Sequence, residues 1–268
     1  MGADIKSLRT RIKSVSSTQQ LTRAMGLVAS SKIRKATERM LHGRDYAAAL
    51  EQVLSALTAS PECARSPYMQ VRDGGKTRLI VIAGDRGLAG GYNANIFRTA
   101  KEYPDADIIP IGKRACDRFG GEVRLCEKMD SRSAYDLAVS LCNDFAAGEY
   151  DRLGIVYTRY VSMMSQQPEV LWILPLTRDE NAKSAATLFE PDEQTILNTA
   201  VPEYVTGRIV AAVRESYASE VVARRMAMDS AGKNAQAMID DLQLQYNRAR
   251  QNAITQEITE IVAGSGNY

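Results

Sequence analysis

The sequence predicts an α/β protein in which long N- and C-terminal helices form an antiparallel coiled coil. Two observations predict the helices: both ends of the chain carry apolar residues at intervals of three and four, and both have very few prolines and glycines. A third observation concerns the middle of the chain, where short apolar runs rich in β-branched residues alternate with helical patterns. This alternation is typical of a Rossmann-like α/β domain with a mainly parallel sheet.

The N-terminal segment, residues 1–58, is predicted to be one long helix. No proline occurs before Pro61, so the helix is expected to run from about residue 4 to about residue 57. Its apolar stripe has an interruption at residues 16–18, where the interval between apolar positions slips. The stripe consists of Ile5, Leu8, Ile12 and Val15, followed after the slip by Leu21, Met25 and Val28. Residues 59–75, with two prolines and two glycines, are predicted to form a loop.

Residues 76–200 are predicted to form the globular α/β domain. Its first strand, "TRLIVIAG" at residues 77–84, is a continuous apolar run, as expected for a parallel strand buried on both faces. Further strands are predicted at residues 107–112, 122–127, 152–160 and 169–176. Helices are predicted at residues 93–102, 114–119 and 133–147. The helices then provide the crossover connections that parallel strands require.

The C-terminal segment, residues 201–268, is predicted to be a second long helix. No proline follows Pro202, and helical periodicity continues to about residue 262. At about 1.5 Å per residue, such a helix would be on the order of 90 Å long. Its predicted contact stripe consists of Ala231, Ala235, Met238, Leu242, Ala249, Ile254, Ile258 and Ile261. Because this stripe and the N-terminal one are the only long unpartnered stripes, the two helices are expected to pair antiparallel.

Composition and charge narrow the classes of function. The formal net charge of +2 favours no class of partner, but residues 1–44 hold ten basic and only two acidic residues. The four cysteines lack the spacing of a metal site, and His42 is the only histidine. No apolar run approaches the roughly 20 residues of a membrane span. The N-terminus also lacks the pattern of a secretory signal, so a cytoplasmic protein is expected.

The segment "AGDRGLAGGYN", residues 83–93, is a glycine-rich loop between a strand and a helix, where α/β proteins often hold phosphate. It matches neither nucleotide fingerprint, because it lacks a G-x-G start and no Lys-Ser/Thr pair closes a P-loop. A structural turn or a protein-contact loop is therefore favoured over nucleotide binding. The nearby charged residues form no catalytic constellation, so an enzyme is not expected. The basic N-terminal helix could instead bind nucleic acid, but its bases surround the helix, which favours a protein partner.

Four segments together resemble one known family, the γ subunit, or central stalk, of bacterial-type F-type ATP synthases. These segments, in the family's order, are "TQQLTRAMGLVASSKIRKA", "DRGLAGGYN", "FEPD" and "YNRARQNAITQEITEIVAG". The resemblance covers essentially the whole chain, and its C-terminal motif is the most specific. It implies a non-catalytic subunit with no cofactor and no metal.

The resemblance also assigns residues to partners. Contacts with the catalytic subunits are implied for Met25, Arg23, Lys32, Arg34, Asp85, Arg86, Arg250 and Gln251. Within this set, Arg250 and Gln251 match a pair that hydrogen-bonds a loop of one catalytic subunit at a time. Contacts with the membrane ring and the ε subunit are implied for Phe189, Glu190 and Asp192.

The function implied by the resemblance is that of a central rotor shaft, which couples ion translocation through a membrane ring to ATP synthesis or hydrolysis. The implied partners are three α and three β subunits around one copy of this chain, the ε subunit and the c-subunit ring, with no nucleic acid. The implied location is peripheral, on the cytoplasmic face of the cell membrane. Two alternatives of other classes are a nucleotide-binding α/β enzyme and a nucleic-acid-binding coiled-coil protein.

Overall fold

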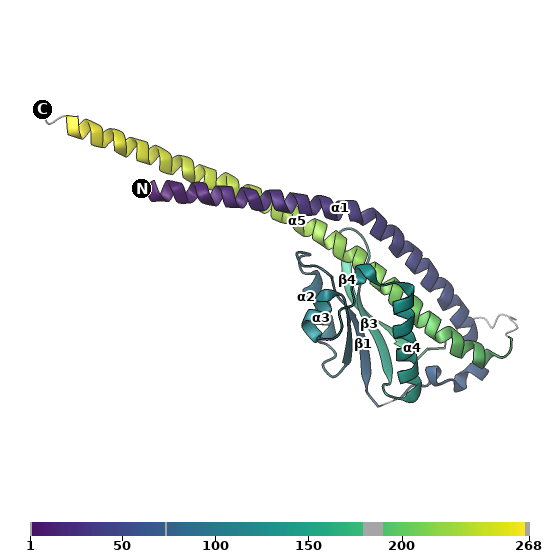
Figure 1. The fold of residues 1–268 in the computed structure, drawn as a ribbon. Helices are drawn as coiled ribbons and strands as arrows, with labels where there is room; N and C mark the ends of the chain where they lie inside the picture. The colour runs from purple at the N-terminus through teal and green to yellow at the C-terminus, as the bar shows by residue number, and fades with distance from the viewer. Residues whose placement is uncertain (1, 73, 179–189, 266–268) are drawn as a thin grey trace. The chain divides into compact units, whose positions relative to one another are not determined.

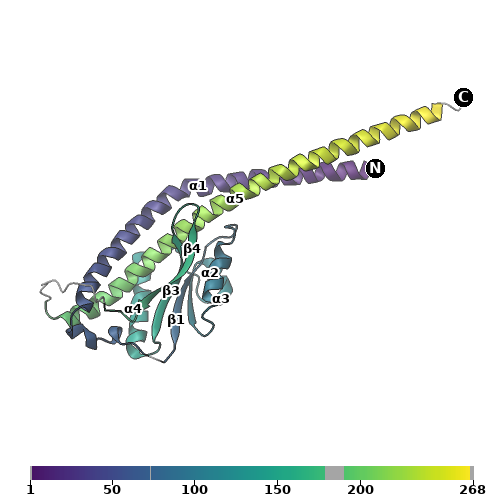
Figure 2. The same cartoon turned by 180° about the vertical axis from the view of Figure 1, so that it is seen from behind.

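The computed structural model describes residues 2–72, 74–178 and 190–265. The chain divides into two compact units, one made of residues 1–30 with 224–268 and the other of residues 31–223. Two helices run through both units, α1 (Gly2–Thr58) and α5 (Glu193–Ser265) (Figures 1 and 2). Among the described residues, no helix is long and apolar enough to cross a membrane.

The first unit is an antiparallel pair formed by the N-terminal part of α1 and the C-terminal part of α5. The Gln19 Nε2 atom donates to Gln236 Oε1 over 2.8 Å, and the Arg9 guanidinium lies 6.0 Å from the Tyr246 ring centroid. Residue numbers thus rise on one helix as they fall on the other. The buried or half-buried positions of α1 follow alternating intervals of three and four without a break: Ile5, Leu8, Ile12, Val15, Gln19, Thr22, Gly26 and Ala29. This is the heptad pattern of a coiled coil.

The predicted slip in the stripe of α1 is therefore wrong. Leu21 and Val28 are 60% and 54% exposed, and only Met25 of the shifted stripe is half-buried. The contact positions beyond residue 15 hold small and polar residues, so the apolar residues beside them resembled a displaced stripe. The predicted stripe of α5 was wrong at Met238, because its apolar neighbour Ile239 is the buried residue. It was also wrong at Ile254, Ile258 and Ile261, which are exposed. The α5 contact positions are Met228, Gly232, Ala235, Ile239, Leu242, Tyr246, Ala249 and Ala253.

The second unit is built on a four-stranded sheet in the order β2-β1-β3-β4. Its strands are β1 (Thr77–Ile82), β2 (Asp107–Ile111), β3 (Arg152–Tyr160) and β4 (Gln166–Leu174). Strand β1 pairs in parallel with β2 and β3, and β4 pairs antiparallel with β3 through a hairpin. The predicted mainly parallel sheet is confirmed.

The predicted strand at residues 122–127 is wrong, because the segment is irregular and ends in the short 3-10 helix η3 (Cys126–Lys128). It makes one backbone bond next to β2, where the Arg124 carbonyl accepts from the Gly112 N–H over 2.6 Å, and it forms no ladder with the sheet. The N–H groups of Cys126 and Glu127 instead donate to the Asp85 carboxylate, each over 2.9 Å. A side chain thus satisfies groups that a sheet would otherwise have used.

Helices cover both faces of the sheet (Figure 1). On one face, α2 (Tyr92–Ala100) and α3 (Lys113–Phe119) pack against Leu79 and Val81 of β1. On the other, α4 (Ser131–Ala147) and α5 pack against Ile80 and Ile82. Successive side chains of β1 point to opposite faces, and because both faces are covered, residues 79–82 are all buried. A continuous apolar strand therefore suits the middle layer. Between α1 and β1 lie two short 3-10 helices, η1 (Glu62–Arg65) and η2 (Pro67–Met69).

Helix α5 begins at Glu193, inside the range 76–200 that the sequence assigned to the globular domain. Asp192 caps it: its Oδ1 atom accepts from the Thr195 N–H over 2.8 Å. Pro202 lies within the helix instead of near its start. The capping aspartate, not the proline, is therefore the sequence signal for where this helix begins.

The register of the coiled coil yields a direct test. Ile239→Ala removes a buried side chain between α5 and α1 and should lower the free energy of unfolding by roughly 2–3 kcal/mol. Met238→Ala, one position away and exposed, should change it by no more than about 0.5 kcal/mol. Urea unfolding of the full chain, followed by helical circular dichroism, measures both. The reverse order of effects would restore the sequence-based register.

Candidate functional site

The glycine-rich loop, residues 83–93, begins directly after the carboxyl end of β1. After β1 the chain continues to β2 on one side of β1, and it later returns to β3 on the other side. The carboxyl end of β1 is therefore the topological switch point of the sheet, where the order of the strands reverses. In open α/β sheets, ligands bind in the crevice at such a point. The loop therefore lies where other α/β proteins bind phosphate.

Three successive backbone donors at the start of the loop are bound to the protein's own side chains. The Gly84 N–H donates to Asn93 Oδ1 over 2.8 Å. The N–H groups of Asp85 and Arg86 donate to the two carboxylate oxygens of Glu220, each over 3.3 Å. Glu220 belongs to α5 and is only 1% exposed. A carboxylate of the chain therefore occupies the position that a phosphate would need, which argues against the nucleotide-binding alternative.

Asp85, predicted to contact a catalytic subunit, has both oxygens engaged inside the protein. Its two oxygens accept from the N–H groups of Cys126 and Glu127, as described above. Its Oδ1 atom also accepts from the backbone N–H of Lys113 over 3.4 Å. The carboxylate thus holds the segment before α4 against the loop. In the structure, Asp85 therefore stabilises the chain's own backbone. Its predicted contact with a catalytic subunit stays a prediction.

Two other predicted contact residues, Lys32 and Arg86, meet at Glu127. The Lys32 Nζ atom lies 2.8 Å from Glu127 Oε1, and an Arg86 guanidinium nitrogen lies 3.8 Å from Oε2. The hydrogen bond between Lys32 and Glu127 raises the pKa of the lysine and lowers the pKa of the carboxyl. Arg34, two residues further along α1 and so on nearly the opposite side of the helix, is exposed. The structure therefore brings Lys32, Arg86 and the loop together and leaves Arg34 apart from them.

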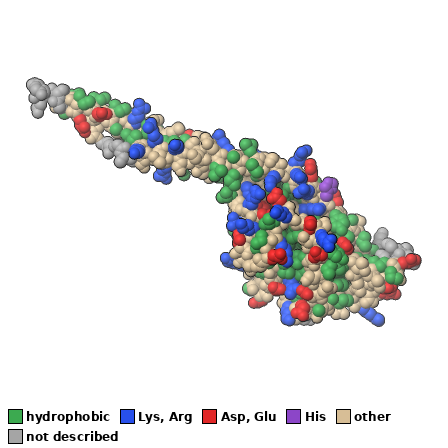
Figure 3. Space-filling view, in the orientation of Figure 1, with side chains coloured by type: hydrophobic (Ala, Val, Ile, Leu, Met, Phe, Trp, Pro, Cys, Tyr) green, Lys and Arg blue, Asp and Glu red, His purple; other side chains and the backbone are tan. Residues whose placement is uncertain are grey.

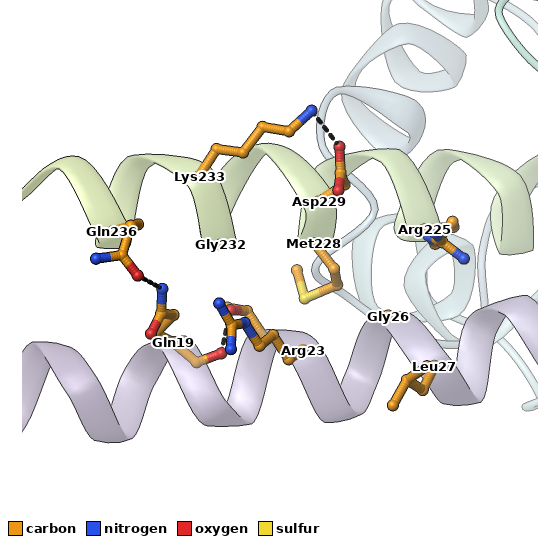
Figure 4. A pocket seen from close by; sticks show the side chains of 11 residues that line it. Gln19, Arg23, Gly26, Leu27, Arg225, Met228, Asp229, Gly232, Lys233 and Gln236 are labelled. Atoms are coloured by element: carbon orange, nitrogen blue, oxygen red, sulfur yellow. Dashed lines mark hydrogen bonds and ion pairs between the residues drawn. The ribbon is translucent and has the colours of Figure 1, made fainter.

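A groove of about 460 Å³ lies between the helices of the first unit (Figure 4). Small residues open it, since Gly26 of α1 and Gly232 of α5 have no side chains to fill the space. Met228 points from α5 toward α1, whereas Lys233 pairs with Asp229 over 2.8 Å on the outer side of α5. The groove is thus bounded by the contact positions of the two helices.

Two of the predicted contact residues belong to this stretch of α1. Arg23 is exposed and lines the groove, and Met25 is half-buried. Leu27 points away from α5 and is 71% exposed. The outer surface of α1 here carries both cationic and apolar side chains, which is the mixture found on protein-contact surfaces.

Arg250 and Gln251 are exposed neighbours on α5, near the last contacts with α1 at Ala249 and Ala253. Beyond this point the apolar side chains of α5 are 43–65% exposed: Ile254, Ile258, Ile261 and Val262. Figure 3 shows hydrophobic side chains gathered at this end of the helix. An exposed apolar stripe interspersed with polar residues is a surface for another protein.

The segment predicted to contact the ring and the ε subunit is only partly described. Phe189 lies outside the described residues, and Glu190 is exposed. Asp192 uses its carboxylate to cap α5, with Oδ2 accepting from the Thr195 hydroxyl over 2.7 Å. The hydrogen bond from the Thr195 side chain, with that from its N–H, lowers the pKa of Asp192.

Sequence reasoning missed two buried acids of α5, Glu215 and Glu220. Glu215 pairs with Arg44, and its Oε1 atom accepts from the Tyr160 N–H over 2.8 Å. Arg44 in turn donates to the Tyr160 carbonyl over 2.6 Å, so the pair holds the end of β3. The signal was present in the sequence, because both acids interrupt an apolar stretch of helix. Buried acids require partners, and these partners lie far away along the chain.

The described residues contain no group of three or more histidine, cysteine or acidic side chains placed to hold a metal ion. All four cysteines are free thiols and buried: Cys63, Cys116, Cys126 and Cys142. Burial raises the pKa of Cys142 to about 12 and the pKa of Cys126 well above its ordinary value. The thiols of Cys126 and Cys142 are thus held in the protonated form at neutral pH.

The fold defines a class of protein in which two long helices form a coiled coil and an α/β domain is inserted between them. A model of the ATP synthase family matches residues 4–266. The chain is 40% identical to an ATP synthase gamma chain of Ruminococcus albus across 99% of both chains. It is 38% identical to that of Pelotomaculum thermopropionicum, across 97% of this chain and 98% of the relative. The chain belongs to the ATP synthase gamma chain family, and the resemblance is confirmed.

A solved structure supports the fold independently. A chain of the Euglena gracilis mitochondrial ATP synthase, in a structure of OSCP, F1 and the c-ring, has a TM-score of 0.69 to this protein at 19% identity. The similarity covers 99% of this chain and 95% of that one. The arrangement of long terminal helices around an α/β domain is therefore shared at low sequence identity.

The capping role of Asp192 predicts a pH-dependent effect. Because its pKa is lowered in the folded state, its stabilising effect is present above the ordinary value of 3.8 and is lost as the pH falls through the lowered value. Asp192→Ala should therefore lower the urea midpoint at neutral pH, and the difference from the unsubstituted chain should shrink in acid. Glu190→Ala, which removes an exposed carboxylate that does not cap the helix, serves as the control. An equal loss at all pH values would contradict the capping role.

Proposed function

We propose that this chain is the central rotor shaft of an F-type ATP synthase, coupling ion translocation through a membrane ring to ATP synthesis or hydrolysis. The observation that carries the proposal is family membership over the full length of the chain, together with a long helix pair whose tip presents exposed side chains. The chain itself is non-catalytic. Chemistry takes place on the surrounding subunits.

The proposed mechanism relies on asymmetry. One helix pair presents different faces to three equivalent catalytic subunits, so their nucleotide affinities differ at any instant. Turning the shaft exchanges those affinities among the subunits, which is a population shift driven by differential contacts. The helix pair meets this requirement because its two helices differ in their exposed residues: α1 presents Arg23 and Leu27, and α5 presents Arg250 and Ile254.

The contact residues follow from the resemblance, and the exposure of Arg23, Arg34, Arg86, Arg250 and Gln251 supports them. We assign eight residues to contacts with the catalytic subunits: Met25, Arg23, Lys32, Arg34, Asp85, Arg86, Arg250 and Gln251. Lys32 and Asp85 also make the contacts within the chain described above. Glu190 and Asp192, with Phe189, are assigned to the side of the membrane ring and the ε subunit. We place the chain at the cytoplasmic face of the cell membrane, as a peripheral subunit held by its partners.

Composition of the native complex tests the proposal first. The chain is expressed with an affinity tag in its own host, and the membranes are extracted gently with detergent. Native mass spectrometry then measures the mass of the complex that co-purifies with the tagged chain. We expect one copy of this chain with three copies each of two larger subunits. Recovery of the chain alone, or with nucleic acid, would contradict the proposal.

The C-terminal pair tests the mechanism. Charge-assisted hydrogen bonds contribute roughly 1.5–3 kcal/mol, and about 1.4 kcal/mol is a tenfold change in rate, so Arg250→Ala with Gln251→Ala should lower ATP turnover about tenfold or more. Assembly should survive, since both side chains are exposed and outside the helix contact. Arg118→Ala, an exposed arginine of α3, is the control and should leave turnover unchanged. Unchanged turnover in the double variant would remove the assigned role.

A further inference from the structure

Glu220 joins the shaft helix α5 to the glycine-rich loop. Its carboxylate is 1% exposed, and its two oxygens accept from two successive N–H groups, those of Asp85 and Arg86. A buried carboxylate is stable only when its oxygens are hydrogen-bonded, so this pairing satisfies both the acid and the loop. The bond joins residues that are 135 positions apart along the chain.

The loop is shaped to fit this carboxylate. A Cβ atom at Gly84 would lie 2.9 Å from Glu220 Cδ and 3.1 Å from Asn93 Oδ1, so only glycine allows this approach. At the other end of the loop, the Tyr92 hydroxyl donates to the carbonyl of Ser216 over 3.0 Å. Residues 216 and 220 are one turn apart on α5, on the same face of the helix. Both ends of the loop are therefore attached to α5.

The middle of the loop is left to face outward. Leu88 is 61% exposed and has a φ of 61°, a left-handed conformation that is rare for a residue with a branched side chain. Arg86 is similarly exposed, with a side chain that is 64% accessible. Backbone strain of this kind persists only where the surrounding structure imposes it. On either side of Leu88, the bonds of Asp85, Arg86 and Tyr92 to α5 hold the loop.

We propose that Glu220 is the positioning residue that fixes the loop to α5, so that Arg86 and Leu88 turn with the shaft as one rigid surface toward the catalytic subunits. This inference rests on the proposed function. It adds a residue that contacts no partner itself and acts through the loop. The crevice that binds ligands in other α/β proteins thereby becomes an internal attachment between the α/β domain and the helix.

Hydrogen exchange tests the attachment without reference to function. In the full chain, Glu220→Ala should speed exchange of the amides of residues 84–88 by about tenfold or more, since two charge-assisted bonds are lost. Exchange in β3 and α4 should not change, because their side chains belong to hydrophobic clusters that do not contain Glu220. Added acetate, which supplies a carboxylate of the missing size, should slow exchange in the loop again. Glu203→Ala, which removes an exposed acid of the same helix, is the control.

Glu220→Gln keeps the volume of the side chain and guards against loss of the fold. Its amide oxygen can accept from one of the two N–H groups, so exchange in the loop should be faster than in the unsubstituted chain and slower than in Glu220→Ala. If amides throughout the chain exchange fast in Glu220→Ala, the fold itself has been lost, and exchange in Glu220→Gln becomes the test of the attachment. Fast exchange confined to the loop supports the proposal, and unchanged or global exchange in Glu220→Gln overturns it.

Ion transport per ATP hydrolysed, measured with the assembled complex in vesicles, tests the consequence. We expect assembly to survive in Glu220→Gln and the coupling ratio to fall severalfold, with Glu203→Ala unchanged. A loosened loop with full coupling would overturn the proposal, because presentation of the loop would then not matter. Should the unsubstituted complex itself fail to couple, the proposed function would be refuted, and the exchange experiment would still decide the attachment.

Discussion

The structure depends on the packing of two helices that lie at opposite ends of the chain. In the first unit, unbroken intervals of three and four on both α1 and α5 bring eight positions of each helix into contact. In the second unit, α5 contributes Val201, Val205 and Ile209 to the main hydrophobic cluster, and α1 adds Leu54 and Leu57 to it. Neither helix could bury these residues alone, because an isolated helix exposes its side chains to water.

Most elements of the fold were predictable because their signals are local. The strands and helices of the α/β domain follow from periodicity over a few residues, and β1 to β4 lie where apolar runs predicted them. The register of the coiled coil was not predictable in this way. Gln19, Thr22 and Gly26 occupy contact positions that a hydrophobicity pattern cannot recognise. The same holds for residues 122–127, whose backbone is satisfied by the side chain of Asp85 from another part of the chain.

The candidate residues separate into two groups that sequence resemblance could not distinguish. One group is exposed: Arg23, Arg34, Arg250 and Gln251. In the other group, the carboxylates of Asp85 and Asp192 accept hydrogen bonds from backbone N–H groups of the same chain. A sequence motif can contain both kinds of residue, because a contact surface needs side chains that touch a partner and side chains that hold them in place. Glu220 belongs to the second group, and it was not assigned from the sequence because it lies outside the four segments that carry the resemblance.

The burial of all four cysteines has a practical consequence for experiments that follow rotation. Reagents such as maleimides react with thiolates that are accessible, and none of the native thiols is exposed. A single cysteine introduced on the outer surface of α5 would then be the one reactive thiol on the folded chain. Fluorophores or surface tethers can therefore be attached at a chosen height on the helix without first removing the natural cysteines, and so without disturbing the core that contains them.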